Sequence, residues 1–118
     1  MTNNEVKEKS LAFAKRVVNA YRYLCEEKNE YVLSKQFLRS GTSIGANVTE
    51  AQYPQSLPDM LSKFKIARKE CVETESWLKL LYSNNSIDEE TFKNYRNLCG
   101  RIQRMLTSSC ITIENKIK

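Results

Sequence analysis

Basic side chains at helical spacing are the residues of this chain whose pattern indicates a chemical role. One run from Lys9 to Cys25 and another from Thr91 to Ile113 carry arginine and lysine but no aspartate or glutamate. Rows of cations along a helix bind phosphates through Coulomb attraction and counterion release, without recognising the base sequence. The sequence therefore predicts nucleic-acid contacts at the following basic residues: Lys15, Arg16, Arg22, Lys93, Arg96, Arg101 and Arg104.

Two other interpretations of these basic runs stay open. Any soluble helix needs a charged outer face, and a net charge of +5 over 118 residues is moderate. No RNA-recognition motif, arginine-rich tail or aromatic stacking platform accompanies the runs. The same surface could instead dock an acidic protein, which would make the chain a protein–protein adaptor.

The sequence argues against catalysis and against a metal centre. It contains no histidine, which is the commonest general base and the commonest metal ligand of proteins. The cysteines stand far apart and never in the closely spaced pairs of a zinc site; they are Cys25, Cys71, Cys99 and Cys110. We expect reduced and mostly buried thiols in a non-enzymatic protein with no cofactor and no metal.

Apolar residues recur at alternating steps of three and four over nearly the whole chain, which predicts amphipathic helices. The stripes contain Leu11, Val18 and Cys25; Phe37, Ile44 and Val48; Phe64, Cys71 and Leu78; and Tyr95, Ile102 and Leu106. With few glycines and prolines for turns, a many-stranded β fold is not favoured. We therefore expect an all-α, antiparallel up-and-down four-helix bundle that forms a single domain over residues 1–118.

The expected helices span about residues 4–28, 31–53, 57–83 and 87–115. Ser56 to Asp59 has the pattern of a capping box, and Pro58 falls in the first turn, where its missing N–H is tolerated. Ser86 to Glu89 repeats that pattern before the fourth helix. Both positions therefore predict helix starts.

More apolar surface is present than a monomeric bundle needs. The first helix carries a second apolar stripe, and the third carries apolar residues nearly opposite its main stripe. Exposed apolar surface usually marks an interface, and tryptophan is favoured at interface centres. We expect self-association, although bending or rotation of the helices could also bury these side chains. The expected interface residues are Phe13, Val17, Leu24, Ile66, Trp77 and Leu80.

Residues 40–51 are rich in small side chains and include two glycines within a helix. Each glycine costs about 1 kcal/mol relative to alanine, so we expect Gly41 and Gly45 to allow the close approach of another backbone. A polar stripe runs beside them, and it is either a solvated face or a buried hydrogen-bond network. We favour a structural network, whose members would be Arg39, Ser43, Asn47 and Glu50.

The first residues, MTNNEVKEKS, are polar and lack the apolar core of a secretory signal. No apolar run approaches the roughly 20 residues that span a bilayer. We expect a cytoplasmic protein that does not enter a membrane.

A pattern in the second and third helices resembles a known family. Similarity to the 23S rRNA intervening-sequence proteins, which are four-helix bundles, is carried by Leu38-Arg39-Ser40-x-x-Ser43-Ile44-x-x-Asn47-Val48-x-Glu50, Ile66-Ala67-x-x-Glu70 and Glu73-x-Glu75-x-x-Leu78. That family resembles in turn the accessory variability determinant proteins of diversity-generating retroelements. The resemblance covers about residues 10–110 and departs from the usual pattern at Gly45 and Ala51.

The resemblance implies a ring-like homopentamer with a basic surface that binds nucleic acid, and it implies no defined biochemical role. The leading hypothesis is a non-enzymatic oligomer that binds structured RNA or DNA as an adaptor or chaperone. The alternative is a protein–protein adaptor that docks an acidic partner such as a reverse transcriptase, without direct nucleic-acid contact.

Overall fold

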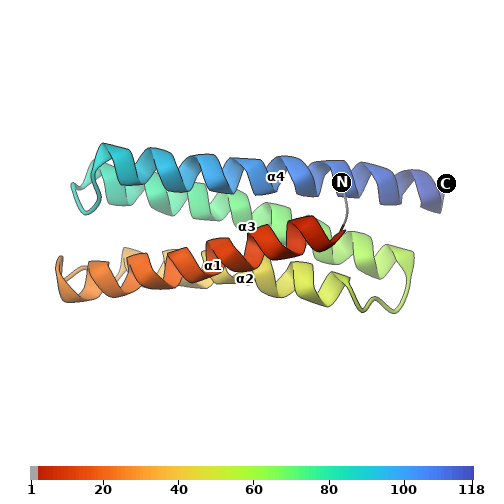
Figure 1. Ribbon diagram of the computed structural model, residues 1–118, viewed down its shortest axis with the longest axis horizontal. Coiled ribbons are helices and arrows are strands. Elements are labelled where there is room, and N and C mark those ends of the chain that lie inside the picture. Colours follow the sequence, from red (N-terminus) through yellow and green to blue (C-terminus); the bar gives the residue numbers. More distant parts are fainter. Residues whose placement is uncertain (1–2) are drawn as a thin grey trace.

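The computed structural model describes residues 3–118, which form four helices joined by short turns (Figure 1). The helices are α1 (Asn3–Glu26), α2 (Leu33–Ala51), α3 (Leu57–Ser83) and α4 (Glu89–Ile117). Every boundary lies within two residues of its expected position. The described residues contain no strand, so the expected all-α fold is confirmed.

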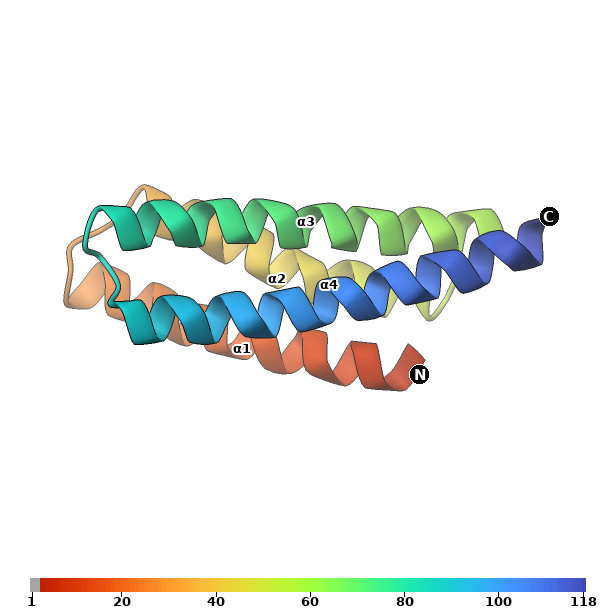
Figure 2. The same cartoon turned by 90° about the horizontal axis from the view of Figure 1, so that it is seen from above.

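Successive helices run in opposite directions, as an up-and-down bundle requires (Figures 1 and 2). Each helix packs against the next one along the chain, and the contact between α1 and α4, which closes the bundle, is the least extensive of the four between neighbouring helices. The result is a rod with Cα extents of 49 × 21 × 19 Å. Its loosest seam lies between the two helices that carry the basic runs.

One stripe of each helix forms the apolar core. The helices α2, α3 and α4 bury the predicted stripes, whose largest members are Phe37, Ile44, Phe64, Leu78, Ile102 and Leu106. All four cysteines are free thiols, and Cys71, Cys99 and Cys110 are buried, whereas Cys25, which the sequence places on an apolar stripe, is only partly buried. Reduced cysteines therefore serve as small core residues.

The first helix buries a different stripe from the expected one. Phe13, Val17 and Leu24 are at most 2% exposed within the single chain, whereas Leu11 is 45% exposed. These three residues cannot form an oligomer interface, because the neighbouring helices already cover them, so the prediction is wrong for Phe13, Val17 and Leu24. The two stripes lie side by side at the same period, so only packing against α2 and α4 fixes the rotation of α1.

Gly41 and Gly45 bring α1 and α2 into close contact, as predicted. A Cβ atom at Gly41 would lie 2.8 Å from both methyl carbons of Val17, and one at Gly45 would lie 3.3 Å from the backbone oxygen of Ser10. A side chain at Gly41 would therefore push the two helices apart. Without a side chain at this position the two helices pack closely, and this packing offsets the low helix propensity of glycine.

Side-chain caps fix the starts of α3 and α4. The Ser56 hydroxyl accepts a hydrogen bond from the Asp59 amide at 3.1 Å, as the capping box predicts. At α4 the cap is Asp88, whose carboxylate accepts from the Thr91 amide at 2.8 Å. The expected cap at Ser86 is corrected, because that residue lies buried in the turn, three positions before the helix begins at Glu89.

We predict that Ser56→Ala lowers the free energy of unfolding by about 1 kcal/mol, because a first-turn amide of α3 loses its acceptor. Urea unfolding followed by circular dichroism measures the change. Ser76→Ala is the matched control, since the exposed Ser76 hydroxyl donates only to a carbonyl of its own helix at 3.2 Å. Equal stability of Ser56→Ala and the wild type would contradict the cap.

Candidate nucleic-acid interface

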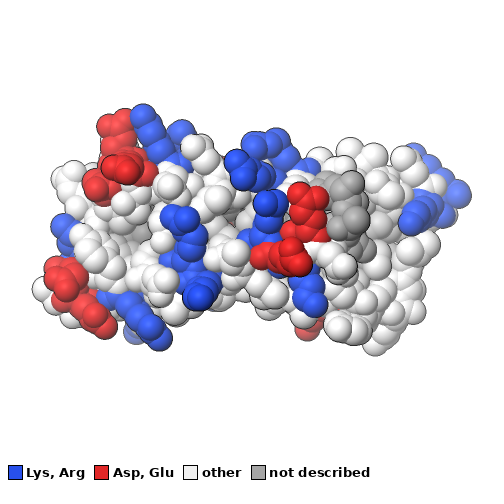
Figure 3. Space-filling view, in the orientation of Figure 1, with Lys and Arg blue, Asp and Glu red and all other residues white. Residues whose placement is uncertain are grey.

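A groove follows the seam between α1 and α4. It is a hollow of about 210 Å³ whose apolar lining includes Phe13 and Ile102. Lys9, Arg16 and Arg101 line the same hollow with basic side chains. Figure 3 shows basic side chains over the middle of the face that α1 and α4 form, with acidic side chains beside them toward the N-terminal end of α1.

Arg16 bridges the seam. Its guanidinium donates a hydrogen bond to the Asn94 side-chain oxygen at 2.8 Å and lies 5.3 Å from the centre of the Tyr95 ring. The Tyr95 hydroxyl donates in turn to the backbone carbonyl of Arg16 at 2.8 Å. These contacts hold an exposed cation in place, so less side-chain entropy is lost when it binds an anion.

Three arginines of α4 line a second hollow, of about 420 Å³, beside the groove. They are Arg96, Arg101 and Arg104, with Gly100 among them, and Glu75 of α3 lines the same hollow with one acidic side chain. A Cβ atom at Gly100 would meet the Arg104 guanidinium at 3.5 Å, so the helix surface between the arginines is open. Because Arg101 lines both hollows, the two adjoin, and their charged lining is basic apart from Glu75.

The basic residues that line the two hollows form what we call the basic face: Lys9, Arg16, Arg96, Arg101 and Arg104. Four of its five members belong to the predicted set of nucleic-acid contacts. The fifth, Lys9, begins the acid-free run of α1, and that run is the signal by which it could have been found.

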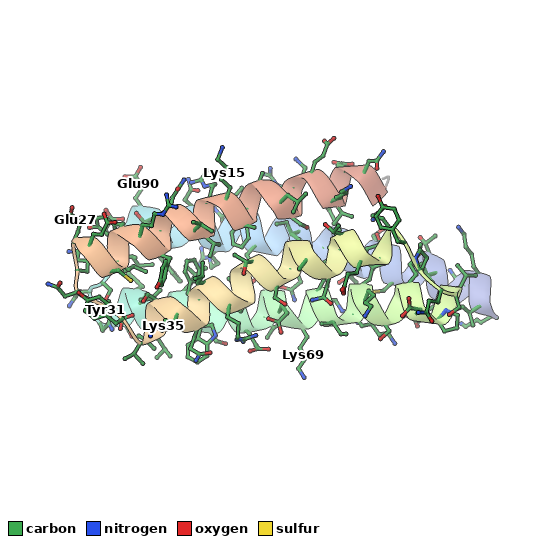
Figure 4. All side chains as sticks on the ribbon, turned by 90° about the horizontal axis from the view of Figure 1, so that it is seen from below. Lys15, Glu27, Tyr31, Lys35, Lys69 and Glu90 are labelled. Atoms are coloured by element: carbon green, nitrogen blue, oxygen red, sulfur yellow. The ribbon has the colours of Figure 1, made fainter. Side chains whose placement is uncertain are left out.

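Three predicted contacts lie outside the basic face. Lys15 points from α1 into solvent (Figure 4). Lys93 is paired with Glu89 at 2.7 Å, one helical turn away. Arg22 is exposed on α1 but lines neither hollow. Helical spacing alone did not distinguish these side chains from those that face the seam.

Acidic side chains bound the basic face at the end of the bundle where α3 turns into α4. A hydrogen bond from the Thr91 amide lowers the pKa of Asp88 below its ordinary value, and a hydrogen bond from Lys93 lowers the pKa of Glu89. Both carboxylates are therefore ionised at neutral pH. An anionic ligand is therefore repelled at this end of the face (Figure 3).

Arg39 and two buried hydroxyls link α2 to α3. Arg39 donates to Glu70 at 3.2 Å and to Glu73 at 2.8 Å. The fully buried Thr74 hydroxyl donates to that of Ser40 at 2.9 Å in the same interface. These polar contacts hold α2 in register against α3 within an otherwise apolar core.

The polar residues of α2 that were expected to form one hydrogen-bond network make separate contacts instead. Among the described residues, Asn47 donates to Ser43 inside the helix, whereas Glu50 pairs with Lys63 of α3 at 3.6 Å. Arg39 and Glu50 are about 16 Å apart along the helix axis, at a rise of about 1.5 Å per residue. The expectation of one network is therefore corrected, because each of these two side chains reaches across to α3.

Glu70 should give the chain a distinctive pH dependence. Burial and the neighbouring Glu73 carboxylate raise its pKa, and Arg39 only partly offsets them. Folded protein then binds more protons than unfolded protein, so the free energy of unfolding falls as pH rises from the ordinary glutamate pKa through the raised one. We predict that Glu70→Gln removes this fall, and urea titrations across that window measure it. Glu114→Gln is the exposed control, and superimposable pH profiles of Glu70→Gln and the wild type would contradict the prediction.

The outer face of α3 carries the other predicted interface residues. Ile66 is 40% exposed and Leu80 is 46% exposed, so both are accessible. Trp77 packs against the core and is half-buried, and its indole N–H is buried with no hydrogen-bond partner among the described residues. Trp77 therefore contributes less free surface than its helical position suggests.

The buried thiols are poor nucleophiles. A hydrogen bond with Cys99 and burial raise the pKa of Cys71 far above its ordinary value, and burial also raises the pKa of Cys110. Over residues 3–118, no three histidine, cysteine, aspartate or glutamate side chains are grouped to hold a metal ion. In the same part of the chain, none of the helices has the length and apolar character to cross a membrane.

Comparisons with known proteins identify one family. The family model described as 23S rRNA-intervening sequence protein matches residues 2–108. The chain is also 48% identical to a crystal structure of a protein of unknown function from the S23 ribosomal protein family of Bacteroides thetaiotaomicron VPI-5482. The match covers 93% of this chain and 98% of the other, with a TM-score of 0.92. The comparison with curated proteins gave no match.

Proposed function

This chain belongs to the 23S rRNA-intervening sequence protein family, and from that premise we propose that it binds structured RNA or DNA through its basic face. It acts without catalysis, as an adaptor or chaperone for the nucleic acid. The observation that supports this proposal most directly is the pair of adjoining, mostly basic hollows that share Arg101, one at the seam between α1 and α4 and one between α4 and α3.

The dimensions of the basic face suit a nucleic-acid backbone. Arg96 and Arg104 are eight residues apart, which is about 12 Å along the helix axis at a rise of about 1.5 Å per residue. The phosphates of one duplex strand advance by about 3.4 Å along the axis. One bundle therefore offers cations to roughly three or four successive phosphates. Contacts of this kind fix position on a helix without selecting a base sequence.

The direct test is a binding titration with a hairpin RNA and a duplex DNA over a range of salt concentrations. The proposal expects binding at low salt and a linear fall of the logarithm of the affinity with the logarithm of the salt concentration. Absence of binding to both nucleic acids at low salt would overturn the proposal.

Self-association belongs to the same proposal, through the accessible part of α3. Light scattering is expected to give a multiple of 13.7 kDa, and the family resemblance implies five subunits. The combined variant Ile66→Glu/Leu80→Glu should shift the protein to monomer, because two buried and unpaired carboxylates strongly oppose association. Val32→Glu, at a residue that is 73% exposed, should leave the assembly intact. A monomeric wild type would contradict this part of the proposal.

The alternative function, docking of an acidic protein such as a reverse transcriptase, uses the same arginines. Arg16 and Arg96 both lie over aromatic rings, at 5.3 Å and 5.2 Å from the ring centres, and guanidinium groups held in this way also suit carboxylates. A salt-sensitive complex with an acidic protein, together with no affinity for nucleic acid, would favour this alternative.

A further inference from the structure

A hollow larger than the two of the basic face lies beyond them and has a different chemistry. It measures about 720 Å³ and lies between the C-terminal half of α1 and the turn from α3 to α4. Its walls combine aromatic rings with amide groups and one lysine: Tyr23, Tyr82, Tyr95, Asn19, Asn85 and Lys28. The volume lies within the range of about 300–1,000 Å³ that is usual for small-molecule and cofactor sites.

Packing fixes two of the three aromatic walls. The Tyr82 ring stacks on Phe92 of α4, with ring centres 4.7 Å apart and planes 7° from parallel. Tyr95 is anchored by the hydrogen bond of its hydroxyl to the Arg16 carbonyl. Tyr23 is 47% exposed at the hollow. Tyr82 is 37% exposed and Tyr95 only 9%, so a planar ligand would meet mainly the rings of Tyr23 and Tyr82.

The hollow adjoins the basic face through a shared contact. Tyr95 lines the hollow, and the Arg16 guanidinium over its ring lines the seam groove. Asn19 lies three residues after Arg16, which is about 4.5 Å farther along α1. A nucleic-acid strand with a phosphate at Arg16 would therefore have a neighbouring base within reach of the hollow.

The polar groups of the hollow favour a base over a phosphate. Asp88 and Glu89 line it as ionised carboxylates, which repel phosphate but accept hydrogen bonds from the amino groups of bases. The amides of Asn19 and Asn85 can both donate and accept, as base edges require. Lys28 supplies one cation for the phosphate that a base carries with it.

From these observations we infer that the hollow binds an unpaired base of the nucleic acid whose phosphates lie on the basic face. The inference rests on the proposed function and specifies it, because it makes the preferred ligand a duplex or hairpin with an adjoining single-stranded segment. Stacking on tyrosine supplies affinity with little dependence on which base is bound, since every base has an aromatic face.

The experiment uses three fluorescent hairpin RNAs: one blunt, one with a short single-stranded tail, and one with the same tail made abasic. The base-bearing tail should strengthen binding about tenfold over the blunt hairpin, whereas the abasic tail should add little. Tyr23→Ala and Asn19→Ala should each reduce that advantage and leave the affinity for the blunt hairpin unchanged. Tyr53→Ala is the matched control, because this tyrosine is 78% exposed outside the hollow.

The outcomes separate this inference from the proposed function. Equal affinity for the base-bearing and abasic tails would overturn the base site while leaving phosphate binding in place. A tail advantage that survives Tyr23→Ala and Asn19→Ala would also overturn it, because the tail would then be bound elsewhere. If the wild type binds none of the three hairpins at low salt, the proposed function and the base site both fail.

Discussion

The triple variant Arg96→Glu/Arg101→Glu/Arg104→Glu is expected to bind structured RNA and duplex DNA at least about a hundredfold more weakly than the wild type. A hydrogen bond to a charged group contributes about 1.5–3 kcal/mol, so the loss of two or three such contacts accounts for this factor. Reversal of charge adds repulsion of the phosphates. The three side chains line a hollow on the surface of α4, so their replacement leaves the apolar core intact.

The control for this variant changes the net charge equally, away from the basic face and from the exposed face of α3. Lys35→Glu/Lys116→Glu/Lys118→Glu alters exposed lysines near the start of α2 and at the C-terminal end of the chain. If binding depends on the basic face, the control should retain most of the affinity. Similar losses in both triple variants would show that only total charge matters, and they would contradict the proposed interface.

Salt dependence provides a second measurement on the same variants. Each phosphate contact contributes about 0.9 to the slope of log affinity against log salt concentration. The arginine variant should therefore have a shallower slope than the wild type, by about the number of contacts that it loses, whereas the lysine control should keep the slope. Equal slopes for the wild type and the arginine variant would place the bound phosphates elsewhere.

Gly41→Ala is expected to destabilise the bundle by about 1–2 kcal/mol, although alanine is the better helix former. The gain in helix propensity is about 1 kcal/mol. Against it stands a Cβ atom placed 2.8 Å from both methyl carbons of Val17, a fully buried and β-branched residue that cannot turn aside. Overpacking of this kind costs about 1–3 kcal/mol, or more where helices must separate. Urea unfolding of the purified variant measures the net effect.

The other two glycines give a graded comparison with Gly41. Gly100→Ala should stabilise α4 by up to about 1 kcal/mol, because its Cβ atom would meet only the Arg104 guanidinium, at 3.5 Å. Gly45→Ala should be nearly neutral, since contacts of 3.2 Å and 3.3 Å offset the propensity gain. Equal stabilisation by all three substitutions would show that helix propensity alone determines the change in stability. That result would contradict the close packing of α1 on α2.

A double-mutant cycle assigns the effect at Gly41 to its contact. In a Val17→Ala background, Gly41→Ala should cost about 1 kcal/mol less than in the wild type, because the two clashing methyl groups are gone. Additive costs in the double variant would mean that the strain arises from another neighbour.

The sequence alone determined the helices, their order and their ends to within two residues. These features depend on neighbours along the chain: apolar residues at a period of 3.6 and a capping serine at Ser56. The close approach at Gly41 was also predicted from local sequence, because the low helix propensity of a glycine inside a helix must be offset by packing. Four of the five members of the basic face were found in the same way, from runs without acidic residues.

Only the tertiary structure decided which face of α1 is buried and which basic residues lie together on one surface. Two apolar stripes of α1 had the same period, and contacts with residues far along the chain selected the one that contains Val17 and Phe13. The same rotation turned Arg16 toward Tyr95 and Lys15 into solvent. A helical period fixes which residues share a face, but the direction of that face depends on packing between helices, and here that packing separates the basic face from the other charges of the surface.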